Sequence, residues 1–252
     1  MGANIEADVV TPLHKSSTFH VIGAGRSGTS LLSALLNAHP SIEVGFEKHT
    51  QEMLVRQDPD ETSDAAIGRE KRYLQAARLD ISRSAQSNLM WGNKITTEQL
   101  WNLWSNRLDQ VRLQLLIENL FVQELDANPV VYVLRDGRSC VLSKMNRAGL
   151  TLEDSCARWQ FSIRCLECLQ RAQLPLCLVR FENLVRRPQE TLSVLCEHLG
   201  VEYDVCMLEG TKSENLLPEY RQEGFDVTKS ESVPFPCRGI EILAEDLGLC
   251  GY

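Results

Sequence analysis

A glycine-rich loop between an apolar strand and a leucine-rich helix constrains the fold of this chain more than any other feature. Residues 19–22 (FHVI) form a short apolar run, residues 23–30 (GAGRSGTS) form the loop, and leucines recur at helical spacing over 31–36. Glycines let the backbone turn tightly and approach an anion, and the free N–H groups at a helix start attract negative charge. The segment therefore predicts a phosphate-binding loop in an α/β fold.

This loop fits the spacing of the triphosphate-binding motif G-x-x-x-x-G-K-[S/T], with one residue replaced. Thr29 occupies the position of the lysine that normally reaches the β- and γ-phosphates. The loop still has a cation, Arg26, earlier in the sequence. The replacement argues against ordinary triphosphate chemistry and favours a shorter phosphorylated group. The groups expected to hold that phosphate belong to Arg26, Ser27, Gly28, Thr29 and Ser30.

The composition is that of an acidic globular protein of 252 residues, long enough for one substantial core. Its net charge of −8 leaves no basic excess for general nucleic-acid binding, so an anion site must be a local basic pocket. No apolar run approaches the length of a membrane span, and the N-terminus lacks the apolar core of a signal peptide. We therefore expect a cytoplasmic protein.

The nine cysteines all lie from Cys140 onward, and their odd number favours reduced, buried thiols over a disulfide framework. Cys165 and Cys168 form a C-x-x-C within an apparently helical stretch. No second pair is suitably spaced for zinc, so we expect no metal site.

Strands and helices alternate along the chain after a loose leader expected over residues 1–17. Further strands are predicted by short apolar runs at 42–46, 89–91, 130–134 and 176–179. Helical patterns fall at 97–126, 138–147, 153–172, 188–199 and 239–247. This alternation predicts a single α/β domain over residues 18–252, in which a central parallel sheet carries helices on both faces.

Cationic side chains follow three of the predicted strands. Arg26 comes after the first, Lys94 after the run at 89–91, and Arg135 after the run at 130–134. Ligands of open parallel sheets bind at the carboxyl ends of the strands, so we expect the three cations to converge on one anion site.

In combination, these features resemble the sulfotransferases that use 3′-phosphoadenosine 5′-phosphosulfate (PAPS), above all the tyrosylprotein sulfotransferases and related bacterial proteins. The resemblance covers about residues 19–200. It is carried by GRSGTS (25–30), His39-Pro40, Gly45-x-Glu47, Asn93-Lys94, VLRDGR (133–138), Ser143, Arg147 and VRFENL (179–184). It implies in-line transfer of a sulfuryl group to an acceptor hydroxyl without a metal.

The resemblance also implies which residues are catalytic. Glu47 matches the carboxylate that takes the acceptor's proton, while Arg26 and Lys94 would stabilise charge on the departing 5′-phosphate. His49 is a nearby rival for the base. Small-molecule sulfotransferases generally place a histidine base after the lysine-bearing segment, but no histidine occurs between Lys94 and Arg135.

A second phosphate site follows from the same resemblance. Arg135 and Ser143 match the positions that bind the 3′-phosphate of the cofactor and of its product, adenosine 3′,5′-bisphosphate; Arg147 adds charge there. Lys229 is a candidate for a late cofactor-binding lysine. Phe181 departs from the pattern, because the tyrosylprotein enzymes have a tyrosine near this position; their membrane anchor and disulfides are also not expected here.

Two other functions stay open. A nucleotide kinase or NTPase with an altered loop would need Mg²⁺ and an acidic strand end, for which Arg135-Asp136 is a weak candidate. A non-catalytic nucleotide-binding protein would have no use for a base such as Glu47. The acceptor could be a peptide tyrosine, a sugar, a lipid or a small-molecule hydroxyl, and the sequence does not determine the oligomeric state.

Overall fold

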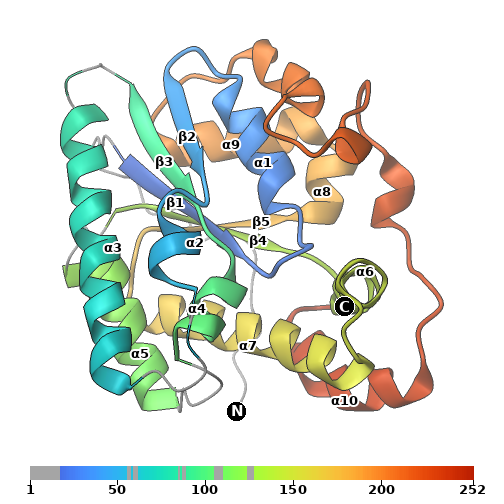
Figure 1. The fold of residues 1–252 in the computed structure, drawn as a ribbon. Helices are drawn as coiled ribbons and strands as arrows, with labels where there is room; N and C mark the ends of the chain where they lie inside the picture. Colours follow the sequence, from blue (N-terminus) through green and yellow to red (C-terminus); the bar gives the residue numbers. More distant parts are fainter. Residues whose placement is uncertain are drawn as a thin grey trace.

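The computed structural model describes residues 18–55, 58, 62–84, 86, 89–104, 110–123 and 128–252. The leader expected at 1–17 lies outside the described residues. A five-stranded parallel sheet with strand order β2-β3-β1-β4-β5 lies at the centre (Figure 1). The strands are β1 (Thr18–Gly23), β2 (Ile42–Phe46), β3 (Met90–Lys94), β4 (Val130–Leu134) and β5 (Leu176–Arg180).

Helices cover both faces of this sheet: α1, α8 and α9 lie on one side, and α5, α7 and α10 on the other (Figure 1). The helices are α1 (Thr29–Asn37), α2 (Thr50–Met53), α3 (Ser63–Ser84), α4 (Thr97–Trp104), α5 (Gln110–Glu118), α6 (Gly137–Ala148), α7 (Leu152–Arg171), α8 (Phe181–Arg186), α9 (Pro188–Leu199) and α10 (Cys237–Leu249). A π-helical turn, η1 (Asn119–Gln123), follows α5. Short 3₁₀ segments follow α9: η2 (Val205–Lys212), η3 (Pro218–Tyr220) and η4 (Val227–Ser230). The predicted α/β class is confirmed.

The central strands β1 and β4 divide their side chains between two apolar cores. Val21 of β1 packs in the cluster that includes α1 and α9, whereas the next residue, Ile22, packs in the cluster that includes α7. Val133 and Leu134 of β4 divide in the same way. Successive side chains of a strand point to opposite faces, so a strand between two helical layers is apolar throughout. This explains the unbroken run VVYVL at 130–134.

The structure differs from expectation at β3 and directly after β5. Residues 92–94 belong to β3 itself, with Lys94 opposite Phe46 of β2, rather than following the strand. The close approach of β1 requires glycine at position 92, because a Cβ there would lie 2.4 Å from the Phe19 ring. Helix α8 was not expected; it begins directly at the end of β5.

No helix in the described ranges is both long and apolar enough to cross a membrane. All nine cysteines lie in the described part of the chain, and no disulfide joins any of them.

Candidate functional site

The loop after β1 turns sharply into α1. Gly28 precedes the first residue of the helix with φ 100°, and its carbonyl accepts the Leu32 N–H at 3.0 Å. A Cβ at Gly28 would lie 2.3 Å from Cδ2 of Phe181. Arg26 also has a positive φ, 76°, which is uncommon for a residue with a side chain. The loop therefore has the tight backbone that its glycines predicted.

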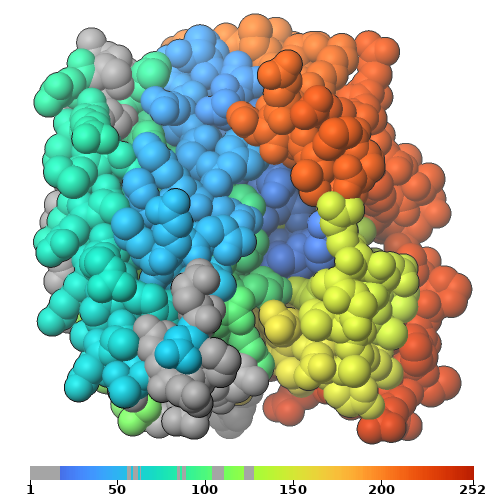
Figure 2. Space-filling view, viewed as in Figure 1, coloured from blue at the N-terminus to red at the C-terminus, as the bar shows by residue number. Residues whose placement is uncertain are grey.

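A cavity of about 340 Å³ opens beside this loop. Six residues expected to bind a cofactor contribute to its wall: Arg26, Gly28, Thr29, Ser30, Arg135 and Ser143; the candidate Lys229 also does so. In Figure 2 the dark-blue segment that contains the loop lies at the bottom of a hollow, beside yellow-green α6 and the orange C-terminal segments. The volume falls within the usual range for ligand sites.

Arg26 is held from two sides within this cavity. Its Nε donates to Ser143 Oγ of α6 at 3.0 Å, and its Nη2 donates to the Tyr220 hydroxyl of η3 at 2.6 Å. Its guanidinium also lies 5.0 Å from the centre of the Tyr220 ring. The structure therefore joins the loop cation Arg26 to Ser143 of α6 and to Tyr220 of η3.

Arg135 projects from the end of β4 against the same loop. Its Nη1 donates to the Arg26 carbonyl at 3.0 Å, and its Nη2 donates to the Lys229 carbonyl at 2.9 Å. The guanidinium stacks over the Phe181 ring at 4.3 Å. Its buried Nε has no hydrogen-bond partner among the described residues. A buried guanidinium N–H without a partner suits an anionic ligand.

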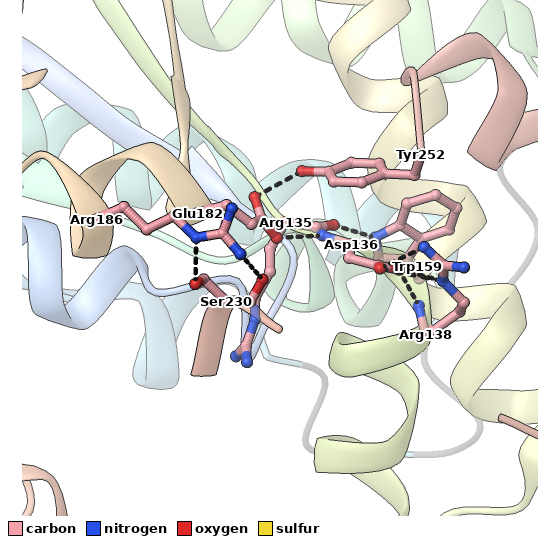
Figure 3. Close-up of polar contacts among 8 residues, drawn as sticks. All are labelled: Arg135, Asp136, Arg138, Trp159, Glu182, Arg186, Ser230 and Tyr252. Carbon is pink, nitrogen blue, oxygen red and sulfur yellow. Dashed lines mark hydrogen bonds and ion pairs between the residues drawn. The ribbon is translucent and has the colours of Figure 1, made fainter. Parts of the chain in front are cut away.

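The backbone next to Arg135 is fixed by hydrogen bonds from several elements (Figure 3). Glu182 accepts the Asp136 N–H at 3.0 Å and the Tyr252 hydroxyl at 2.8 Å. Burial, and then the adjacent Glu182 carboxylate, raise the pKa of Tyr252 well above its usual value, so this phenol is a neutral donor. Trp159 Nε1 donates to the Arg135 carbonyl at 3.3 Å.

The Asp136 carboxylate, which a kinase would need for Mg²⁺, has a structural role. It caps α6 by accepting the Arg138 N–H at 2.9 Å and forms an ion pair with the Arg138 guanidinium at 2.7 Å. This hydrogen bonding raises the pKa of Arg138. Within the described ranges, no group of three or more His, Cys, Asp or Glu side chains could hold a metal ion.

Glu47 and Lys94 meet where β2 and β3 end. The Glu47 N–H donates to the Lys94 carbonyl at 2.8 Å, and the two side chains form an ion pair through Glu47 Oε1. Gln99 of α4 donates to the other carboxylate oxygen, Oε2, at 2.9 Å. The side chain of Lys94 is 4% exposed and that of Glu47 31% exposed. Neither residue contributes to the wall of the 340 Å³ cavity.

Asn93 and Gln99 hold the turn that carries Glu47. Asn93 Oδ1 accepts the Lys48 N–H, and its Nδ2 donates to the Lys48 carbonyl, both at 3.2 Å. Gln99 Nε2 also donates to Thr50 Oγ1 at 2.8 Å. The Asn93-Lys94 pair therefore supplies one residue that supports the turn and one that pairs with the carboxylate.

The rival base, His49, contacts a different carboxylate. Its Nε2 is 2.8 Å from Asp80 Oδ2 of α3, and Lys48 Nζ is 3.0 Å from Oδ1 of the same residue. His39 holds backbone instead: its Nε2 lies 2.8 Å from the Glu202 carbonyl, and its Nδ1 accepts the Ser41 N–H at 3.0 Å.

Three expected cofactor residues have other neighbours. Arg147 forms an exposed ion pair with Glu219, lies 5.5 Å over the Tyr220 ring and does not line the cavity. Ser27 is buried outside the cavity wall, and its hydroxyl has no partner among the described residues. Lys229 lines the cavity, with Nζ 3.6 Å from the Asp226 carboxylate.

Four side chains with such contacts carry no signal in the sequence: Tyr220, Gln99, Glu98 and Lys144. Glu98 Oε2 accepts the Gly25 N–H at 2.6 Å, and Lys144 Nζ donates to the Gly25 carbonyl at 2.8 Å. These contacts join positions that are far apart in the chain, so no local pattern points to them.

Comparisons with known proteins identify relatives of this chain. Protein-tyrosine sulfotransferase 2 of Gallus gallus is 24% identical over 200 residues, which are 74% of this chain and 52% of that protein. Protein-tyrosine sulfotransferase 1 of Danio rerio is 26% identical over 198 residues, which are 74% of this chain and 54% of that protein. The chain thus spans about half the length of these curated relatives.

Among solved structures, the sulfotransferase domain of the Synechococcus PCC 7002 olefin synthase has the same fold. Its TM-score is 0.62 at 18% identity, and the match covers 96% of this chain and 98% of that domain. The sequence profile of the sulfotransferase family matches residues 19–120 and 122–205, well over half of the chain. This protein belongs to the sulfotransferase family.

Proposed function

We propose that the protein transfers the sulfuryl group of PAPS to an acceptor hydroxyl, with Glu47 as the general base. The observation that carries the proposal is one cavity whose wall includes residues of the phosphate loop together with Arg135 and Ser143. A mononucleotide with phosphates on both its 5′ and 3′ positions needs two such sites. A triphosphate does not require the second.

The residues of the cavity fit PAPS in charge and in available donors. The Arg26 guanidinium and the N–H and hydroxyl groups of Thr29 and Ser30 would bind the 5′-phosphate at the start of α1. Arg135, whose buried Nε lacks a partner among the described residues, would bind the 3′-phosphate with Ser143. Bound there, PAPS would supply an activated sulfuryl group and a 5′-phosphate leaving group.

Glu47 is suited to accept a proton because both its carboxylate oxygens are positioned. Lys94 contacts Oε1 and Gln99 contacts Oε2, and a carboxylate oxygen can accept a further hydrogen bond beyond these. Glu47 would take the proton of the acceptor hydroxyl, which would make that oxygen the nucleophile for the sulfuryl group. Lys94 and Arg26 would stabilise negative charge on the 5′-phosphate leaving group.

Ligand-dependent thermal stabilisation tests the proposal. A ligand at a hundred times its dissociation constant adds roughly 2.7 kcal/mol to stability. Adenosine 3′,5′-bisphosphate should stabilise the protein strongly, and ATP with Mg²⁺ should not. Arg135→Ala should abolish this stabilisation. Arg187→Ala, which removes an exposed arginine paired with Glu190 on α9, is the control and should keep it.

Preference for ATP with Mg²⁺ would overturn the proposal in favour of a kinase or NTPase. Binding of adenosine 3′,5′-bisphosphate without transfer to any hydroxyl would favour the non-catalytic alternative. An acceptor panel of peptide tyrosines, sugars, lipids and small phenols, read by mass spectrometry for the transferred sulfuryl group, separates these outcomes. The chain spans only about half the length of the protein-tyrosine sulfotransferases that it matches, so their names do not identify its acceptor. The panel is needed to identify it.

A further inference from the structure

A partly buried ion pair holds both polar groups of Gly25, in the middle of the phosphate loop. Glu98 Oε2 accepts the Gly25 N–H at 2.6 Å, and Lys144 Nζ donates to the Gly25 carbonyl at 2.8 Å. Lys144 also forms an ion pair with Glu98 Oε1. The side chain of Lys144 is 5% exposed and that of Glu98 17% exposed. Three segments distant in sequence therefore meet at one residue of the loop.

The contact at Gly25 is close packed. A Cβ on Gly25 would lie 3.0 Å from both Cδ and Oε2 of Glu98. Glu98 lies in the first turn of α4, where the helix dipole favours a carboxylate, and Lys144 comes from α6. Gly25 is absent from the cavity wall, whereas Gly28, Thr29 and Ser30 belong to it. The two parts of the loop therefore differ: one contacts the ion pair and the other the cavity.

A carboxylate beside an anion-binding loop needs a counter-charge. Alone, the Glu98 carboxylate would repel a phosphate bound at the neighbouring N–H groups, and the repulsion would be strong because the site is partly buried. The Lys144 ammonium balances this charge, and another of its N–H groups donates to the Gly25 carbonyl. Neither residue belongs to the motifs that led to the proposed function.

We propose that Glu98 and Lys144 are positioning residues that form a charge-balanced clamp on Gly25. Glu98 holds the Gly25 N–H, so that the N–H groups of residues 28–30 remain directed to the bound phosphate. Lys144 removes the repulsion that this carboxylate would otherwise exert. The inference rests on the proposed function for the identity of the phosphate ligand.

Calorimetric titration with adenosine 3′,5′-bisphosphate tests the charge balance. Lys144→Met leaves the Glu98 carboxylate without its counter-charge and should raise the dissociation constant about tenfold. Glu98→Gln keeps an acceptor for the Gly25 N–H and should bind at least as tightly as the wild type. The double variant, Glu98→Gln with Lys144→Met, should recover to within about threefold of the wild type, because the pair is then neutral.

An exposed glutamate–lysine pair in η2 provides the matched control. Glu209→Gln and Lys212→Met make the same substitutions where Lys212 Nζ lies 3.0 Å from Glu209 Oε2 on the surface, and neither should change the dissociation constant. Thermal unfolding without ligand shows that each variant is folded. A Lys144→Met variant that binds like the wild type, or a double variant as weak as Lys144→Met alone, would overturn the clamp.

Amide hydrogen exchange separates a failed clamp from a failed function. The peptide covering residues 23–30 should exchange slowly in the ligand-free wild type and faster in Glu98→Leu, which has no acceptor for the Gly25 N–H. If the wild type does not bind adenosine 3′,5′-bisphosphate, the proposed function fails and this difference still decides the clamp. Equal exchange in the two proteins would refute it.

Discussion

The guanidinium of Arg135 lies 4.3 Å from the centre of the Phe181 ring. The same ring covers Gly28, where a Cβ would approach within 2.3 Å of Cδ2. Phe181 therefore contacts both the start of α1 and the arginine proposed for the second phosphate. A cation–π contact of this kind contributes about 0.5–2 kcal/mol, depending on its exposure.

Gly28→Ala should disturb the site through this ring. The new methyl group would displace Phe181, and φ 100° at position 28 is unfavourable for alanine. We expect a loss of stability of about 1–3 kcal/mol by urea unfolding and a clear loss of affinity for adenosine 3′,5′-bisphosphate.

Gly149→Ala is the matched control, because Gly149 also has a positive φ, 62°, but a Cβ there meets nothing within 4 Å. It should lower stability only because alanine disfavours a positive φ, and it should leave ligand affinity unchanged. Equal affinities of the two variants would show that the position of the Phe181 ring over Gly28 does not affect ligand binding.

Glu47→Gln should separate binding from chemistry. The amide keeps the size of the side chain but cannot act as a base, so the rate of transfer at saturating PAPS should fall by about 10²–10⁴. Affinity for adenosine 3′,5′-bisphosphate, measured by calorimetry, should stay within a few-fold. His49→Gln tests the rival: if this variant loses transfer and Glu47→Gln does not, His49 is the base.

Stability should fall as the pH drops below 6.5, with His20 as one cause. Burial lowers the pKa of His20 from 6.5 to about 4. Between these values the unfolded chain binds a proton that the folded protein does not, so protonation favours unfolding. The stability present above pH 6.5 is thus lost toward pH 4, by about 3 kcal/mol for this residue.

Urea unfolding of the wild type and of His20→Phe at pH 7 and pH 4.5 measures this contribution. Phenylalanine cannot titrate and can keep an edge contact with Phe121, whose ring centre is 5.4 Å from that of His20. The variant should lose less stability on acidification. Identical losses in both proteins would mean that His20 does not contribute to the pH dependence.

The cysteines should fall into reactive and protected groups. Cys206 and Cys237 are exposed, whereas six others are buried. Burial raises the pKa of Cys140, for example, to about 11, which lowers its thiolate fraction at neutral pH. A disulfide reagent at pH 8 should therefore modify the two exposed thiols before the six buried ones in the folded protein, and all nine thiols in urea. Rapid modification of the buried thiols before unfolding would contradict this.

Local patterns were sufficient to predict the sheet and the strand-end residues. The loop at 23–30 and the run at 130–134 each carry their signal within a few residues. Strand ends converge in any parallel sheet, so Arg26 and Arg135 could be predicted to meet. Lys94 is the last residue of β3 rather than the residue after it, and it lies outside the cavity that Arg26 and Arg135 line.

Contacts between distant elements could not be predicted in this way. Arg147 is four residues from Ser143 on α6, and helical spacing alone suggests a shared ligand, but Glu219 forms an ion pair with it. Tyr220 lies in a stretch without helical or strand periodicity, so nothing local indicates that it reaches Arg26. Glu98 and Lys144 are 46 positions apart and look like ordinary surface charges in the sequence.

Glu98 and Gln99 are neighbours in the first turn of α4, and successive helical residues are rotated by about 100°. One reaches Gly25 of the phosphate loop, and the other reaches Glu47. Two adjacent residues of α4 therefore fix the position of the phosphate loop relative to the proposed base, Glu47. An insertion between these residues would misalign donor and acceptor while leaving every residue of the family motifs intact.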